Sequence, residues 1–113
     1  MKAKIIGVIV GVIFLTCAIA AAVQNKGAKD IQLEGGDRGL VPFPHHLHQK
    51  TIGDCNACHA TFPQTAGIIE ELKKQGKLKP KQVMNKSCIK CHRAKKKAGL
   101  KTGPITCSQC HVR

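Results

Sequence analysis

The sequence has no tryptophan and no tyrosine, and only three of its 113 residues are phenylalanine. Acidic residues are also scarce: six Asp and Glu stand against 19 Lys and Arg, which gives a formal net charge of +13. Beyond residue 23, only 17 side chains are Val, Ile, Leu or Phe. Such a chain buries too little apolar surface to order itself through a hydrophobic core alone. The composition therefore excludes a large catalytic scaffold and indicates either disorder or a core supplied by metals, disulfides or cofactors.

The N-terminus is typical of an export signal. A short basic start precedes an uncharged run at residues 5–23, in which Ala20-Ala21-Ala22 offers the small side chains that a signal peptidase requires. We expect residues 1–22 to be a signal peptide and residues 23–113 to be a single exported domain. The alternative is an uncleaved membrane anchor, because the uncharged run would reach roughly 28 Å, close to the hydrocarbon thickness of a bilayer.

The cysteines follow one pattern. Cys17 lies inside the uncharged run and is interpreted as a buried apolar residue, whereas the six others all belong to C-x-x-C-H units. The units are Cys55-Asn56-Ala57-Cys58-His59, Cys88-Ile89-Lys90-Cys91-His92 and Cys107-Ser108-Gln109-Cys110-His111. C-x-x-C-H is the attachment signature of c-type haem. On one helical turn the two thiols share a face and can add to the two vinyl groups of a porphyrin, while the histidine lies beneath the iron.

Two other uses of these cysteines explain the pattern less well. Three disulfides would leave the histidine after every second cysteine without a reason. Zinc accepts Cys and His ligands, but three units of three ligands do not divide into tetrahedral sites, and exported thiols tend to be oxidised. The pattern therefore predicts three covalently attached c-type haems, with His59, His92 and His111 as proximal iron ligands.

The other three histidines of the chain lie together at His45, His46 and His48. A histidine cluster just before the first C-x-x-C-H unit is suited to supply further iron ligands. The alternative is a group of solvated loop histidines, which would not explain why every non-proximal histidine lies within four positions.

The sequence resembles the small three-haem members of the class III multihaem cytochromes c, the periplasmic relatives of tetrahaem cytochromes from anaerobic metal- and sulfur-respiring bacteria. The resemblance runs from about Ile31 to His111. It rests on a short hairpin, on Phe43-Pro44-His45 with His48, and on Asp54 directly before the first C-x-x-C-H unit. It implies a small, mostly irregular α fold with a short N-terminal β-hairpin, organised around three covalent haems.

The resemblance also implies the distal ligands. By position, His45 would bind the first haem and His48 the last, the one attached at Cys107 and Cys110. Relatives usually carry a histidine four residues before the first cysteine of the middle site, where this chain has Met84. Because a thioether can ligate haem iron, Met84 is assigned to the middle haem. The alternatives are His46 as that ligand, its side chain facing away from His45 in an extended segment, and Met84 as an apolar filler against porphyrin.

Sequence patterns also predict the local structure. Alternating residues on both sides of Gly35-Gly36-Asp37 predict a hairpin of residues 31–34 and 40–43 that covers one haem. Thr65 is expected to cap a helix over Ala66–Gln75, with a Glu70–Lys74 pair and Gly76 at its end. A second helix is expected from Cys88 to about Ala98, stopped by Gly99.

Eleven lysines crowd the second half of the chain. A basic surface can simply maintain solubility, or it can steer acidic redox partners into brief encounters. Nucleic acid is not expected, because the protein is predicted to be exported and lacks the aromatic platforms of single-strand binders.

These observations predict a periplasmic electron carrier that is not an enzyme and whose three haems serve anaerobic respiration. Two alternatives remain open. If the middle haem loses its distal ligand easily, the protein would be a haem-based small reductase or ligand sensor. If residues 1–22 persist, it would be a membrane-tethered subunit of a respiratory complex.

Overall fold

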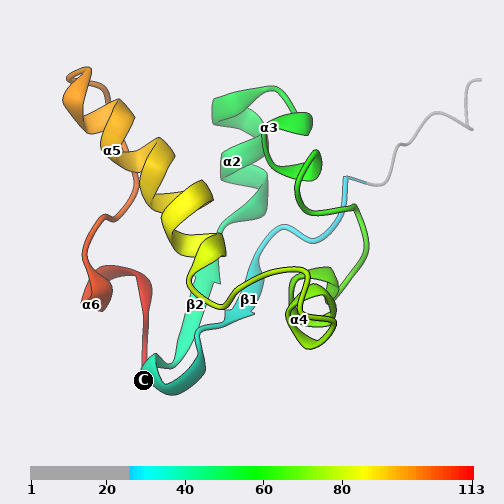
Figure 1. Cartoon of the computed structure of the whole chain (residues 1–113). Helices are drawn as coiled ribbons and strands as arrows, with labels where there is room; N and C mark the ends of the chain where they lie inside the picture. Colours follow the sequence, from blue (N-terminus) through cyan, green and yellow to red (C-terminus); the bar gives the residue numbers. More distant parts are fainter. Residues whose placement is uncertain (1–25) are drawn as a thin grey trace, which may run out of the picture.

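The computed structural model describes residues 26–113. The predicted signal peptide at residues 1–22, the domain boundary after it and Cys17 lie outside the described residues. Figure 1 shows helices arranged around a small hairpin, with the C-terminus beside the hairpin turn. The elements are β1 (Ile31–Glu34), η2 (Gly36–Arg38), β2 (Leu40–Phe43), α2 (His45–Ile52), α3 (Asn56–His59), α4 (Ile68–Lys74), η3 (Met84–Cys88), α5 (Ile89–Lys97) and α6 (Cys107–Cys110). The prediction of a mostly helical chain with a short N-terminal hairpin is confirmed.

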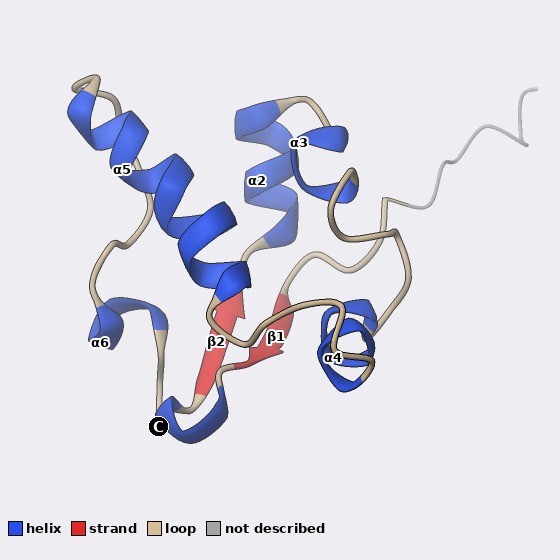
Figure 2. Ribbon diagram, viewed as in Figure 1, coloured by secondary structure: helices blue, strands red, loops and turns tan. Residues whose placement is uncertain are grey.

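The hairpin forms where the sequence predicts it. Strands β1 and β2 pair antiparallel with Ile31 opposite Phe43 and Glu34 opposite Leu40, and a 3-10 turn joins them (Figure 2). Leu40 and Val112 also exchange backbone hydrogen bonds of 3.0 and 2.8 Å, so the C-terminus adds an isolated bridge to β2. This bridge brings the third C-x-x-C-H unit next to the hairpin.

The histidine cluster lies on a helix, which corrects the expectation of an extended segment. Helix α2 begins at His45, directly after Pro44, a residue that favours helix starts. The backbone N–H of His46 donates to the carbonyl of Lys29 at 3.0 Å, which satisfies one of the unpaired donors of the first turn. Consequently His45 and His48, three positions apart, share one face of the helix, and His46 lies off that face.

Helix α4 starts later than predicted. Its N-cap is Gly67 in the left-handed region, and Thr65 makes no cap hydrogen bond. Lys73, and not Lys74, forms the ion pair with Glu70, at 2.7 Å. The stop at Gly76 is confirmed: Gly76 has φ 69°, and the N–H of Lys77 donates to the carbonyl of Leu72 at 2.9 Å.

Helix α5 also starts one residue later than predicted, after the π-helical turn η3. Its end at Gly99 is confirmed, because Gly99 has φ 72° and the N–H of Leu100 donates to the carbonyl of Lys95 at 3.0 Å. In the described part of the chain only Phe62, Leu78 and Ile89 are buried apolar residues, and no side chain there is completely buried. The polypeptide therefore provides very little hydrophobic core of its own. Among residues 26–113, no helix has the length and hydropathy needed to cross a bilayer.

Candidate haem sites

The first C-x-x-C-H unit is wound into α3. The carboxylate of Asp54 accepts the N–H of Asn56 at 2.9 Å and so stabilises the start of this turn. Because Cys55 and Cys58 lie three positions apart on helical backbone, their thiols can reach one porphyrin. The Nδ1–H of His59 donates to the carbonyl of Phe62 at 2.7 Å, which leaves its Nε2 lone pair free to bind a metal.

His45 lies opposite His59. Their ring centroids are 6.2 Å apart with planes at 87°, and the Nδ1–H of His45 donates to the carbonyl of Ala28 at 2.8 Å. A metal–nitrogen bond of about 2 Å and about 1.1 Å from nitrogen to ring centre, on each side of an iron, place two axial imidazole centres about 6.2 Å apart. The pair therefore fits a haem iron between its two Nε2 atoms.

The second unit opens α5, and its histidine lies opposite α2. The centroids of His48 and His92 are 6.3 Å apart, and their planes meet at 30°. The Nδ1–H of His48 donates to the carbonyl of Pro44 at 2.9 Å, and that of His92 to the carbonyl of Pro104 at 2.6 Å. Phe43 packs against the His48 ring at 4.3 Å between centroids. The spacing and the orientation of the nitrogens fit a second iron with two imidazole ligands.

The third unit forms the single helical turn α6. Thr106 caps this single turn through a reciprocal capping box with Gln109. His111 leaves the helix with extended backbone, and its Nδ1 lies 3.5 Å from the carbonyl of Gly39 in the hairpin. Gly35 also approaches this ring, since a Cβ on it would come within 2.4 Å of the His111 Nδ1. The hairpin therefore covers the third site, as predicted for one haem.

Met84 lies near the third C-x-x-C-H unit. A cavity of about 100 Å³ separates η3 and α5 from α6, and both Met84 and His111 line it. Its other lining residues are Asn85, Ile89, Arg93, Ile105, Thr106, Cys107 and Cys110. The cavity thus contains both cysteines and the histidine of the third C-x-x-C-H unit, but neither cysteine of the second.

Two pairings implied by the resemblance are therefore corrected. His48 was expected opposite His111, but its ring lies 6.3 Å from that of His92. Met84 was expected at the middle haem, but it lines the cavity of the last. The reason is helical geometry: α2 places His45 and His48 on one face, toward the first two units, while η3 directs Met84, four residues before Cys88, toward α6.

The other five histidines place Nδ1 near a backbone carbonyl, whereas His46 places Nε2 there. Its Nε2 lies 3.2 Å from the carbonyl of Gly27, so the nitrogen that would face an iron is engaged with the backbone. Its ring centroid is 6.1 Å from that of His45, which shows that spacing alone does not identify a ligand pair. The described geometry does not favour His46 as the alternative ligand.

Electrostatics place the three sites close to one another. Burial raises the pKa of the Cys58 thiol, and the charge of Cys91 raises it further. Burial likewise raises the pKa of Cys88; a backbone hydrogen bond opposes this, and the charges of Cys110, Cys58 and Cys91 add to it. Burial and the charge of Cys107 raise the pKa of Cys110. The cysteines of the second unit therefore lie near enough to Cys58 and Cys110 for their charges to interact.

Sequence reasoning missed the backbone carbonyls that accept hydrogen bonds from the Nδ1 atoms of the imidazoles. The acceptors are carbonyls of residues with no common side-chain type, so no motif marks them. Gly103 was missed as well, although a Cβ there would come within 2.7 Å of the His92 ring. Among residues 26–113, no cluster of three or more His, Cys, Asp or Glu side chains could hold a metal ion alone.

Three helical C-x-x-C-H units with imidazoles opposed across two of them define a small multihaem cytochrome c. The sequence profile described as "Cytochrome c7 and related cytochrome c" matches residues 41–112. The chain is 37% identical over 73 residues to a cytochrome c7 from Geobacter metallireducens, which covers 65% of this chain and 64% of that relative. It is 29% identical over 90 residues to the 26 kDa cytochrome c3 from Desulfomicrobium norvegicum, covering 66% of this chain and 79% of that protein.

Solved structures agree with these relatives. The solution structure of the triheme cytochrome PpcA from Geobacter sulfurreducens matches with a TM-score of 0.53 and 32% identity, covering 76% of this chain and all (100%) of that one. The cytochrome c7 PpcC from the same organism matches with a TM-score of 0.51 and 28% identity, covering 76% and 99%. The chain belongs to the cytochrome c7 family. It is a triheme electron-transfer protein with covalently attached c-type haems.

Proposed function

We propose that the three haems have unequal axial ligands. His45 and His59 bind the first iron, His48 and His92 the second, and Met84 and His111 the third. Each haem is attached through the cysteine pair of its own unit, Cys55 with Cys58, Cys88 with Cys91, and Cys107 with Cys110. The observation that carries this proposal is the orientation of the imidazoles, whose Nδ1 atoms face backbone carbonyls while the rings oppose each other at 6.2 and 6.3 Å.

When bound, the haems supply irons that cycle between the ferrous and ferric states. The chain's own residues hold two ligands at each iron and leave no coordination position for a substrate, which favours electron transfer over catalysis. Histidine pairs keep the potential low, whereas a methionine ligand raises it. The third site is therefore the one that retains electrons most strongly.

We further propose that the protein works in the periplasm, in anaerobic respiration. The basic start, the uncharged run and the small residues at its end support export, and attached haems suit an exported protein. Intact mass of the protein purified from its native host tests this. A mature chain that begins near residue 23 and carries three haems is expected; retained residues 1–22 would instead support the tethered subunit.

The partners that we propose are acidic redox proteins that bind briefly. The described chain is basic along α5, whose last turn carries Lys95, Lys96 and Lys97. Ferricyanide, an anionic oxidant, and a cationic cobalt hexaammine complex provide a direct test on the intact cytochrome. Raising the salt concentration should slow oxidation by the anion and accelerate oxidation by the cation, because salt screens charges beyond about 10 Å at 0.1 M. Equal salt dependence for both oxidants would contradict the proposal.

The ligand proposal is tested by an oxidised and reduced spectrum together with electron paramagnetic resonance. Three haem equivalents, all low-spin, with two histidine pairs and one histidine–methionine pair, are expected. A high-spin equivalent would contradict the assignment.

The third site also suggests a second candidate function. Met84, the distal ligand proposed for the third haem, offers a thioether where the other two sites offer an imidazole. If the thioether dissociates readily, the protein would be a small reductase or a ligand sensor. Carbon monoxide added to the reduced protein distinguishes the two functions: a Soret shift at one haem equivalent supports the sensor, and an unchanged spectrum supports the carrier.

A further inference from the structure

The loop after α5 holds His92 through two hydrogen bonds. The hydroxyl of Thr102 donates to the His92 carbonyl at 3.1 Å, and the Nδ1–H of the ring donates to the Pro104 carbonyl at 2.6 Å. The latter is shorter than the corresponding contacts of His45 and His48. Gly103 lies between these two anchoring residues.

Gly103 packs directly against the imidazole. A Cβ built on it would lie 2.7 Å from Cε1 and 2.8 Å from Nε2 of His92, and its three nearest neighbours would all be atoms of that ring. Side-chain contacts this short are not tolerated, so ring or loop must move. Gly103 does not have a positive φ, so its backbone conformation does not itself require glycine. What requires glycine here is the closeness of the ring.

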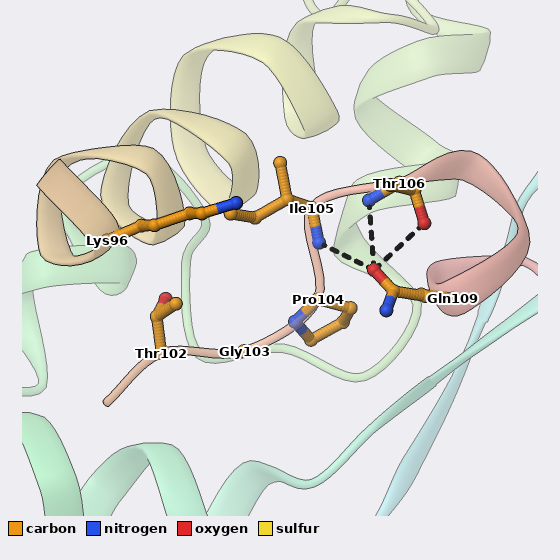
Figure 3. Close-up of a pocket in the computed structure, with 7 residues that line it drawn as sticks. All are labelled: Lys96, Thr102, Gly103, Pro104, Ile105, Thr106 and Gln109. Atoms are coloured by element: carbon orange, nitrogen blue, oxygen red, sulfur yellow. Dashed lines mark hydrogen bonds between the residues drawn. The ribbon is translucent and has the colours of Figure 1, made fainter. Parts of the chain in front are cut away.

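The loop also borders a groove of about 610 Å³, which Thr102, Gly103 and Pro104 help to line. Figure 3 shows the Lys96 side chain extending above them. None of the residues that line the groove is a proposed haem ligand or attachment cysteine. An added methyl group could therefore push the loop outward, but the hydrogen bonds of Thr102 and Pro104 tie the loop to His92. Any displacement of the loop is thereby transmitted to the ring.

We propose that Gly103 is a positioning residue that sets the plane of the His92 imidazole relative to that of His48. The proposal rests on the ligand pair assigned to the second iron above. The planes of these two rings meet at 30°, whereas those of His45 and His59 meet at 87°. Nearly parallel imidazoles interact with the same iron d orbital and split the d levels strongly, while perpendicular imidazoles act on two orbitals equally. Gly103 thus controls the electronic state of one haem out of three.

The test is Gly103→Ala in the holoprotein, followed by electron paramagnetic resonance and by a redox titration that resolves the three haems. We expect the rhombic low-spin signal of the second haem to change and its potential to shift, with the other two haems unaltered. Gly67→Ala is the matched control: its new Cβ meets nothing within 4 Å, but its φ of 73° strains alanine. It should lower stability without altering the second haem.

A milder variant keeps the proposal testable if Gly103→Ala fails to incorporate haem. Thr102→Val removes the hydroxyl bond to His92 and should shift the same haem by less, while Thr102→Ser should restore the wild-type signal. An unchanged second haem in both Gly103→Ala and Thr102→Val would overturn the positioning role. Wild-type protein without two histidine-ligated haems would instead refute the ligand assignment, so the two failures are distinguishable.

Discussion

Met84 and His111 line the same cavity, although one precedes the second C-x-x-C-H unit and the other ends the third. This relationship makes Met84 a ligand candidate for the last haem. Met84→His should lower the potential of that haem by on the order of 100 mV, part of the roughly 0.8 V range that axial ligands set. Nuclear magnetic resonance of the reduced protein should lose the methionine methyl signal that the iron shifts upfield. A change at the second haem instead would contradict this pairing.

His48→Ala and His46→Ala are matched variants, because both residues lie on helix α2. His48→Ala removes the imidazole opposite His92, so the second haem should become five-coordinate and bind one equivalent of carbon monoxide when reduced. His46→Ala should leave the spectrum unchanged, because the Nε2 of His46 lies 3.2 Å from the Gly27 carbonyl. Carbon monoxide binding in the His46 variant alone would mean that the roles are exchanged.

The ring planes predict two different histidine-ligated haems in the unmodified protein. The angle of 87° between His45 and His59 should give an axial low-spin signal, and the angle of 30° between His48 and His92 a rhombic one. Electron paramagnetic resonance of the fully oxidised protein checks both at once. In the His48→Ala variant the rhombic signal, and only that signal, should disappear.

Gly39 provides a stability test. It has φ 92°, and a Cβ there would come within 2.1 Å of the Val112 carbonyl, which bonds to β2. Gly39→Ala should lower the free energy of unfolding by about 1–3 kcal/mol and alter the third haem, because the strand bridge beside His111 would open. Gly36→Ala, whose Cβ meets nothing within 4 Å, is the control. It should cost about 1–2 kcal/mol through its backbone alone and leave the third haem unchanged. Thermal denaturation and haem spectra separate the two variants.

The C-x-x-C-H units, the hairpin and both helix-stop glycines could be predicted from sequence because each depends on a few neighbouring residues. The distal partners could not. The haem expected for His48 and for Met84 was chosen from the order of motifs along the chain. Which unit each side chain faces depends instead on how α2 and η3 are oriented in the fold. The helix over His45–Ile52 was missed because its first turn is supported by a carbonyl from Lys29, outside the local pattern.

The pairing of Leu40 with Val112 joins an early strand to the penultimate residue of the chain. During folding, the compartment around His111 can therefore close only after Val112 has paired with Leu40. A chain truncated by two residues at the C-terminus would keep every cysteine and histidine, yet it would lose the bridge between Leu40 and Val112. Extensions fused at the C-terminus would emerge directly beside the third haem.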